Sequence, residues 1–212
     1  MLQPSKIICV GRNYADHAKE LGNAIPTRPV LFMKPPSSLR TLEQGIVWNQ
    51  ALGECHFECE ICLQIAHPLS QESDKNKVLQ AIGAVTLGLD LTLRDLQSDL
   101  KSKGEPWERA KAFDGSCVLA NWVEADEIGD LQELELILMV NGEQRQHGLT
   151  QQMIFDIATL LVDINQTFSL QAGDVIMTGT PSGVGALHPK DQLTLKLITQ
   201  SGEYDWDTFV QA

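Results

Sequence analysis

The sequence lacks long apolar runs and an excess of positive charge. The longest apolar candidate, residues 81–93, is interrupted by Asp90 and does not reach the about 18 residues that a membrane-spanning helix needs. Sixteen Lys and Arg stand against 28 Asp and Glu, which gives a formal net charge of −12. Nucleic acids and anionic membrane surfaces bind basic faces of proteins, so we expect neither as a partner.

The sequence also lacks a leader-like start and an even set of cysteines. Its first residues, MLQPSK, contain no basic stretch followed by an apolar core. Five cysteines are an odd number and are typical of free thiols in a reducing compartment. We therefore expect a cytoplasmic protein. Its 212 residues fit one domain, 1–212, that needs no disulfide to fold.

Strand patterns outnumber helix patterns. Short apolar or alternating runs predict strands at 6–10, 30–33, 55–66, 81–91, 174–177, 192–198 and 204–210. Asn141-Gly142 predicts the turn of a hairpin over 134–146. Helices are predicted at 13–21, 92–103 and 150–166, with Asn13 and Thr92 as N-caps of the first two. The predicted fold class is α+β, mainly β.

Two glutamates share one face of the alternating segment 55–66. Glu58 and Glu60 are two residues apart, hence about 7 Å along a strand, and like charges at this spacing repel unless water or a cation separates them. Carboxylate oxygens suit a hard divalent cation such as Mg²⁺. The pattern is therefore compatible with a metal site and also with a solvent-facing strand edge.

The cysteines of the same segment suggest a competing site. Cys55, Cys59 and Cys62 have the C-x3-C-x2-C spacing of some iron–sulfur proteins. In a strand, Cys55 and Cys59 point to one face and Cys62 to the other, so the three thiolates would not converge. We therefore do not expect an iron–sulfur cluster.

Asp90 ends a buried apolar run directly before the helix predicted at 92–103. A buried carboxylate is costly unless it is paired or coordinates a metal. Arg94 and Gln97 share a face of the helix, and an Asp90–Arg94 ion pair is the simple alternative to a metal ligand.

Three further segments contain polar side chains that suit catalysis or binding. His17 and Glu20 lie at i and i+3, where a carboxylate strengthens an imidazole as a base, although an ordinary exposed pair has the same spacing. Their helix has little apolar surface, so residues 13–28 are expected to form a mobile lid. Lys111 lies in a loop, where a solvated lysine is the usual case. The turn at 173–185 is a structural turn or an oxyanion cradle.

Taken in order, these segments resemble one family. The stretches that carry the resemblance are CVGRNYADH, HFECE, DLTLRDLQ, KAFDGS, NGEQRQ followed by MIF, and GDVIMTGTPSGVG. They are similar to the motifs of the fumarylacetoacetate hydrolase superfamily, in its small acylpyruvate hydrolase and oxaloacetate decarboxylase-like branch. The resemblance implies a mainly β roll with a few short helices, usually a homodimer, and one Mg²⁺ or Mn²⁺ per subunit.

The resemblance also implies roles for individual residues. It implies that Glu58, Glu60 and Asp90 bind the metal. It implies that Arg94, Gln97, Lys111 and Thr180 contact the oxygen atoms of the substrate. His17 and Glu20 match a catalytic dyad on a lid helix, and Lys111 is a plausible proton donor.

The implied activity is cleavage of the C–C bond of 2,4-dioxo acids. His17 would activate a water that attacks the distal carbonyl, and pyruvate would leave as its enolate. Acylpyruvates and fumarylpyruvate-like acids are the expected small-molecule substrates, with oxaloacetate decarboxylation as a further activity. The alternatives are an isomerase or tautomerase of 2-oxo or 2-hydroxymuconate-type acids and a non-catalytic metabolite-binding homologue. Residues 40–54 match no motif of the family, which leaves the outer pocket undefined.

Overall fold

Strands dominate the computed structural model, which describes residues 3–22 and 24–211. The largest sheet runs in the order β2-β1-β12-β5-β6-β8-β3, with β9 paired to β6. Its strands are β1 (Ile7–Gly11), β2 (Val30–Lys34), β3 (Leu39–Thr41), β5 (Cys59–Ile65), β6 (Ile82–Asp90), β8 (Cys117–Leu119), β9 (Val123–Glu124) and β12 (Val175–Met177). The mainly β class predicted from the sequence is confirmed.

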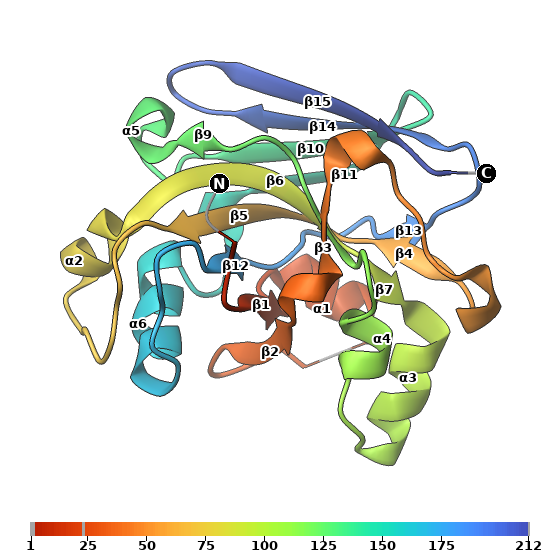
Figure 1. Cartoon of the computed structure of the whole chain (residues 1–212), viewed down its shortest axis with the longest axis horizontal. Helices are drawn as coiled ribbons and strands as arrows, with labels where there is room; N and C mark the ends of the chain where they lie inside the picture. Colours follow the sequence, from red (N-terminus) through yellow and green to blue (C-terminus); the bar gives the residue numbers. More distant parts are fainter. Residues whose placement is uncertain (1–2, 23, 212) are drawn as a thin grey trace.

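Two smaller sheets complete the strand layers. A four-stranded sheet has the order β11-β10-β14-β15 and lies over β5 and β6 (Figure 1). Its strands are β10 (Glu135–Val140), β11 (Glu143–Leu149), β14 (Gln192–Ile198) and β15 (Glu203–Phe209). The third sheet joins β4 (Cys55–Phe57) to β7 (Thr92–Leu93) and β13 (Gly185–Ala186).

The segment 55–66 follows the predicted alternation but is not one strand. β4 and β5 belong to different sheets, and Glu58 lies at the break between them. Residues 55, 57, 59, 61, 63 and 65 all belong to one buried core cluster, to which β10 and β14 also contribute. Cys62 belongs to a second cluster on the opposite face. The period of two therefore holds across the break and keeps both ligand candidates on the face opposite the main core.

The hairpin prediction is confirmed. β10 and β11 pair antiparallel and turn at Asn141 and Gly142, whose φ angles are 53° and 81°. Positive φ at both central residues defines a type I′ turn, whose twist matches that of the flanking strands.

The helices are short and lie at the ends of the main sheet. In Figure 1, α2 and α6 lie side by side at one end, and α3 packs beside α4 at the other. The α-helices are α1 (Ala15–Glu20), α2 (Lys75–Gln80), α3 (Arg94–Lys103), α4 (Glu108–Lys111), α5 (Ala125–Ile128) and α6 (Ile157–Thr167). Single 3-10 turns occur at Pro36–Ser38, Leu42–Gln44, Gln50–Leu52 and Thr150–Gln152.

The starts of the predicted helices were wrong, because tertiary contacts use the expected cap residues elsewhere. Asn13 is fully buried and its amide nitrogen donates to the carbonyls of Phe155 and Thr178, so α1 begins after Tyr14. Thr92 pairs within the third sheet, and α3 begins two residues later.

The helix predicted at 150–166 also starts late. Residues 150–152 form a 3-10 turn, and α6 begins after Asp156, whose side chain accepts a hydrogen bond from the Thr159 amide. The predicted helix end at residue 103 is confirmed, because Gly104 follows with a left-handed φ of 68°.

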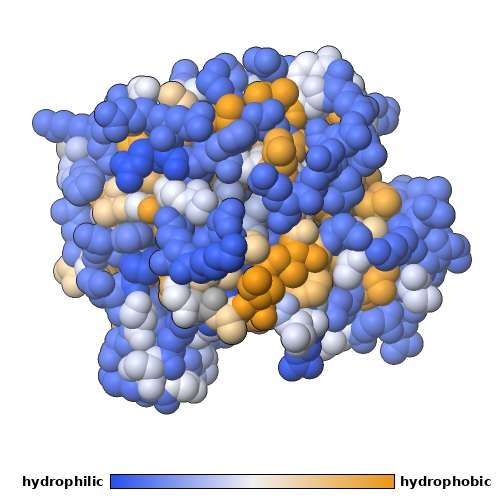
Figure 2. Space-filling model, turned by 180° about the vertical axis from the view of Figure 1, so that it is seen from behind, coloured by the Kyte–Doolittle hydropathy of each residue, from blue (hydrophilic) through white to orange (hydrophobic). Residues whose placement is uncertain are grey.

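None of the helices in residues 3–22 and 24–211 is long and apolar enough to cross a membrane. Most of the face in Figure 2 is hydrophilic, with an apolar area at its lower centre. An open groove is bounded by β2, α3 and α4, and apolar side chains of Met33, Leu52, Leu96 and Phe113 line it.

Candidate active site

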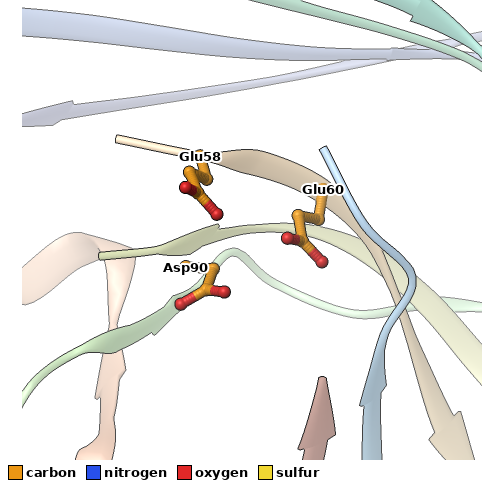
Figure 3. Close-up of side chains that lie close together, drawn as sticks. All are labelled: Glu58, Glu60 and Asp90. Carbon is orange, nitrogen blue, oxygen red and sulfur yellow. The ribbon is translucent and has the colours of Figure 1, made fainter. Parts of the chain in front are cut away.

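Three buried carboxylates converge where the two central strands of the main sheet end. Glu58 precedes β5, Glu60 lies on β5 and Asp90 ends β6, and one oxygen of each lies within 4.8 Å of the others (Figure 3). Their exposed fractions are 6%, 1% and 1%. The Asp90 amide donates to the Glu58 carbonyl at 2.8 Å, so antiparallel pairing fixes the register of the cluster. The alternative of a solvent-facing strand edge is therefore wrong.

Buried cations neutralise two of the three carboxylates. Lys111 donates to Glu58 Oε2 and to Asp90 Oδ2, both at 2.8 Å, and it is only 2% exposed. Arg94 pairs with the other oxygen of Glu58. Asp90 pairs with Lys34 and Lys111 rather than with Arg94, so the simple Asp90–Arg94 ion pair considered from the sequence is wrong.

Glu60 is held by the backbone rather than by one of these ion pairs. Its carboxylate accepts a hydrogen bond from the Gly179 amide at 2.7 Å. Burial, and then the charges of Asp90 and Glu58, raise the pKa of Glu60 well above its usual value. The opposite holds for Glu58, because Lys111 and Arg94 outweigh the effect of burial and lower its pKa.

This donor set fits a divalent cation. All three groups offer carboxylate oxygens, which Mg²⁺ and Mn²⁺ prefer, and they surround one small space. The charge of a cation would relieve the repulsion that raises the pKa of Glu60. The metal prediction is thus supported by the geometry, while the identity of the ion stays a prediction.

Lys34 is a site residue that the sequence interpretation missed. It ends β2 and is fully buried, and its ammonium lies 2.8 Å from Asp90 Oδ1 and donates to Ser116 Oγ at 3.0 Å and to the Lys111 carbonyl. The available signal was a lysine at the end of the apolar run VLFMK, directly before two prolines. Lysines are rarely fully buried unless paired, so its position in an apolar strand was informative.

Of the predicted dyad, His17 lines one pocket together with the three carboxylates, and Glu20 lies beside His17. His17 Nδ1 is 3.3 Å from Glu20 Oε2, and the imidazole is buried rather than exposed. The Gly183 amide donates to both Glu20 oxygens at 3.1 and 3.2 Å, which ties α1 to the turn after β12. The alternative of an ordinary exposed His–Glu pair is therefore wrong, and the mobility of 13–28 stays a prediction.

The remaining predicted binding residues surround the carboxylates. Arg94 Nη1 donates to Gln97 Oε1 at 2.8 Å, which confirms that the two share a helix face. One pocket is lined by the metal-ligand candidates together with His17, Arg94, Gln97, Lys111 and Thr180. The sequence interpretation did not identify the seven other lining residues, which are Val10, Gly11, Arg12, Leu21, Phe32, Lys101 and Trp107.

Cys55 and Cys59 pack in the main core cluster, whereas Cys62 packs in the cluster on the opposite face of β5. All five cysteines are free and buried, and burial is the main cause that raises the pKa of Cys55 to about 12. Within residues 3–22 and 24–211, the one group of His, Cys, Asp or Glu with metal-ligand spacing is Glu58, Glu60 and Asp90. The absence of an iron–sulfur cluster stays a prediction.

Comparison with known proteins identifies the family. The family model described as fumarylacetoacetate (FAA) hydrolase C-terminal matches residues 6–205. The chain belongs to the fumarylacetoacetate hydrolase family. The resemblance inferred from the motifs is thereby confirmed.

Members of this family carry names of different reactions. The chain is 47% identical over 192 residues to oxaloacetate tautomerase YcgM of Escherichia coli (strain K12), covering 90% of this chain and 87% of the relative. It is 42% identical over 185 residues to the mitochondrial oxaloacetate decarboxylase of Dictyostelium discoideum, covering 87% and 84%. Fumarylpyruvate hydrolase from Pseudomonas aeruginosa, solved with Mn²⁺ and pyruvate, has a TM-score of 0.88 at 29% identity, covering 97% of this chain and 90% of that one. This protein is therefore a member of an enzyme family whose fold it shares.

Proposed function

We propose that the protein is a divalent-metal-dependent enzyme that enolises 2-oxo acids, with oxaloacetate keto–enol tautomerisation as its main reaction. The observation that carries the proposal is the cluster of three buried carboxylates with the Lys111 ammonium 2.8 Å from two of them. In tautomerisation a proton leaves C3 of the substrate and a proton is added to the C2 oxygen. A buried proton carrier beside a metal site suits that exchange.

Glu58, Glu60 and Asp90 would hold Mg²⁺ or Mn²⁺. When bound, the cation supplies a Lewis acid that stabilises the negative charge of an enolate. The relative solved with Mn²⁺ and pyruvate supports this assignment.

The other pocket residues bind and orient the substrate. Arg94 and Gln97, fixed to each other at 2.8 Å, present a cation and an amide to carboxylate or carbonyl oxygens. Lys111 holds its proton firmly in the metal-free protein, because Asp90 and Glu58 outweigh burial and raise its pKa. The ring of Phe32, 5.1 Å from the Lys111 nitrogen, limits access of water to it.

The pocket also favours a substrate with two carboxylates. Arg12 and Lys101 line it in addition to Arg94 and Lys111. Partial burial, and then the charges of Arg12 and Arg94, lower the pKa of Lys101. A second carboxylate, such as that of oxaloacetate, would be attracted to this group of cations.

Hydrolysis of 2,4-dioxo acids is the second candidate, favoured by the buried His17 imidazole and its contact with Glu20. His17, oriented by Glu20, would take a proton from a water that attacks the distal carbonyl. The C3–C4 bond then breaks, its electrons form the enolate of pyruvate, and the other product is a carboxylic acid. Oxaloacetate decarboxylation needs the same enolate but no attacking water.

The test is a substrate panel with Mg²⁺, with Mn²⁺ and with chelator. Loss of enol absorbance reports tautomerisation of oxaloacetate, and pyruvate release reports hydrolysis of acylpyruvates and fumarylpyruvate or decarboxylation of oxaloacetate. We expect metal-dependent tautomerisation to be the fastest reaction. Equal rates with metal and with chelator would overturn the proposal.

His17→Ala separates the two candidate reactions. A general base contributes about 10²–10⁴-fold to a rate, so hydrolysis should fall by that factor while Mn²⁺ affinity stays within about twofold. His188→Ala is the matched control, because the side chain of His188 is 73% exposed. Unaltered hydrolysis in His17→Ala would remove the dyad from the mechanism.

Arg12→Gln tests the second carboxylate site. We expect KM for oxaloacetate to rise about tenfold, the size of one lost charge-assisted hydrogen bond, while KM for acetylpyruvate changes little. An equal change for both substrates would contradict the dicarboxylate preference.

We further propose a cytoplasmic homodimer of single-domain subunits. The apolar groove beside β2, α3 and α4 offers surface for a second copy to cover. Light scattering coupled to size-exclusion chromatography measures the mass of the assembly, and a monomer at micromolar concentration would contradict the dimer.

A further inference from the structure

The hairpin strand β11 supplies a buried glutamine to the carboxylate site. Gln146 is 1% exposed, and its three hydrogen bonds all lead to residues around the pocket. Its Oε1 accepts from the Cys59 amide at 2.9 Å. Its Nε2 donates to Thr180 Oγ1 at 2.8 Å and to the Pro181 carbonyl at 2.9 Å.

These bonds close a ring around the break between β4 and β5. Thr180 Oγ1 donates to the Cys59 carbonyl at 2.7 Å, so both backbone polar groups of Cys59 are bound by this pair of side chains. Cys59 lies between Glu58 and Glu60, and fixing its backbone fixes the direction in which both carboxylates leave the chain. The ring therefore joins the segment Glu58–Cys59–Glu60 (the Glu58–Cys59–Glu60 corner) to the Thr180 hydroxyl.

The contact between β11 and the turn after β12 leaves no room for a different arrangement. A Cβ on Gly183 would lie 1.9 Å from the Arg145 carbonyl oxygen, and one on Gly148 would lie 2.8 Å from Pro181. The part of β11 that carries Gln146, from Arg145 to Gly148, therefore packs closely against this turn.

The ring also determines what Thr180 offers to a ligand. A hydroxyl has one hydrogen and two lone pairs. The hydrogen is bound to Cys59 and one lone pair accepts from Gln146, so the remaining lone pair is the one free for the pocket that Thr180 lines. A substrate oxygen that binds there must carry a proton, as the hydroxyl of an enol does.

We propose that Gln146 is a positioning residue that fixes the Glu58–Cys59–Glu60 corner and sets Thr180 as a hydrogen-bond acceptor for the enol form of the substrate. This inference rests on the proposed function for its substrate, but not for its effect on the metal ligands. Gln146 itself does not line the pocket, so it acts through its neighbours.

Gln146→Met is the test variant, because Met has a similar length and keeps the packing while removing all three hydrogen bonds. Gln144→Met is the matched control, since Gln144 is exposed on the same strand. The measurements are thermal unfolding, the Kd of Mn²⁺ alone, and kcat and KM for oxaloacetate.

We expect Gln146→Met to fold, to bind Mn²⁺ about tenfold more weakly and to lose about 10–100-fold in kcat/KM, which is the usual effect of residues that orient metal ligands. The control should stay within about twofold of the wild type in both quantities. A variant that loses only thermal stability, or whose Mn²⁺ affinity equals that of the control, overturns the proposal.

A second variant tests the route through Thr180. In Thr180→Val the hydroxyl is gone, but the bond from the Cys59 amide to Gln146 remains, so adding Gln146→Met should lower kcat/KM by a smaller factor than Gln146→Met does alone. Fully multiplicative losses overturn the coupling between the two side chains. If the wild-type protein turns over none of the substrates, the proposed function fails, and the Mn²⁺ titrations still decide whether Gln146 positions the corner.

Discussion

Asp174 and Glu60 are both buried carboxylates, but their surroundings are opposite. Asp174, just before β12, accepts five hydrogen bonds: from the amide and hydroxyl of Ser5, from the amide and ammonium of Lys6, and from the amide of Gln171. These donors outweigh burial and lower its pKa. Asp174 thereby joins the start of the chain to the strand that pairs with β1.

Glu60 shows what a carboxylate looks like when it is not satisfied by the protein. One amide donates to it, and two further carboxylates lie beside it. A buried charge with so few partners costs stability unless a ligand balances it. The number of donors thus distinguishes Asp174, a structural carboxylate, from Glu60, a carboxylate that suits a metal. The following variants test this distinction.

Glu60→Gln should have the largest effect on function. Orienting residues around metal sites already contribute about 10–100-fold, so loss of a direct ligand should lower kcat/KM by more than about 100-fold and weaken metal binding. The raised pKa means that the folded state holds this carboxyl's proton more tightly than the unfolded state does. Ionisation therefore disfavours folding at neutral pH, and the metal-free variant should unfold at the same temperature as the wild type or a higher one.

Calorimetry of both metal-free proteins and titration with Mn²⁺ check this prediction. A variant with a lower unfolding temperature than the wild type would place Glu60 in the same structural class as Asp174.

Lys34→Met should destabilise the metal-free protein by about 3–5 kcal/mol, because Asp90 would lose one of its two buried cations. A bound divalent ion replaces part of that charge, so Mn²⁺ should raise the unfolding temperature more in the variant than in the wild type. Lys77→Met is the control, since the side chain of Lys77 is 62% exposed. If Mn²⁺ raised the unfolding temperature of Lys34→Met and of the wild type equally, Lys34 would not balance the negative charge of the metal site.

Asp174→Asn should cost about 2–3 kcal/mol of stability and leave Mn²⁺ affinity unchanged. Because the folded pKa of Asp174 is lowered, its contribution is fully present above the unfolded pKa of about 3.9 and is lost as the pH falls through the lower folded pKa. Urea unfolding at pH 7 and below pH 4 checks this, and the variant should lack that part of the acid sensitivity. Asp126→Asn, at an exposed position, is the control.

Ser5→Ala should have the smallest effect. It removes the hydroxyl that donates to Asp174 at 2.7 Å while the other four donors remain, so a loss of about 0.5–1.5 kcal/mol is expected. Urea unfolding measures it. A loss as large as that of Asp174→Asn would show that the five bonds act as one cooperative unit.

Local patterns predicted much of the fold. The alternation around Glu58 and Glu60, the Asn141–Gly142 turn and the helix end before Gly104 all depend on neighbouring residues, and each is present in the structure. The N-caps were wrong because long-range contacts decide them: Asn13 binds Phe155 rather than its own helix.

The site residues that stand in local motifs were also predictable from the sequence. The motifs singled out the carboxylates, the dyad and Lys111, since these residues stand in recognisable local sequences. Lys34 and Gln146 lie in strands that meet the site from elsewhere in the fold, and their contacts place them at the carboxylates.

The sequence by itself determined the alternation of the strands, the acidic charge and the spacing of the two glutamates, because each depends on residues a few positions apart. It did not distinguish Asp174 from Glu60, which both lie in strand segments of similar apolar character. The tertiary structure decided that difference: four of the five donors to Asp174 lie 168 or 169 residues away in the chain, whereas folding brings Asp90 and Glu58 beside Glu60. Electrostatics acts through space, so only folding determines which buried acid is left in need of a cation.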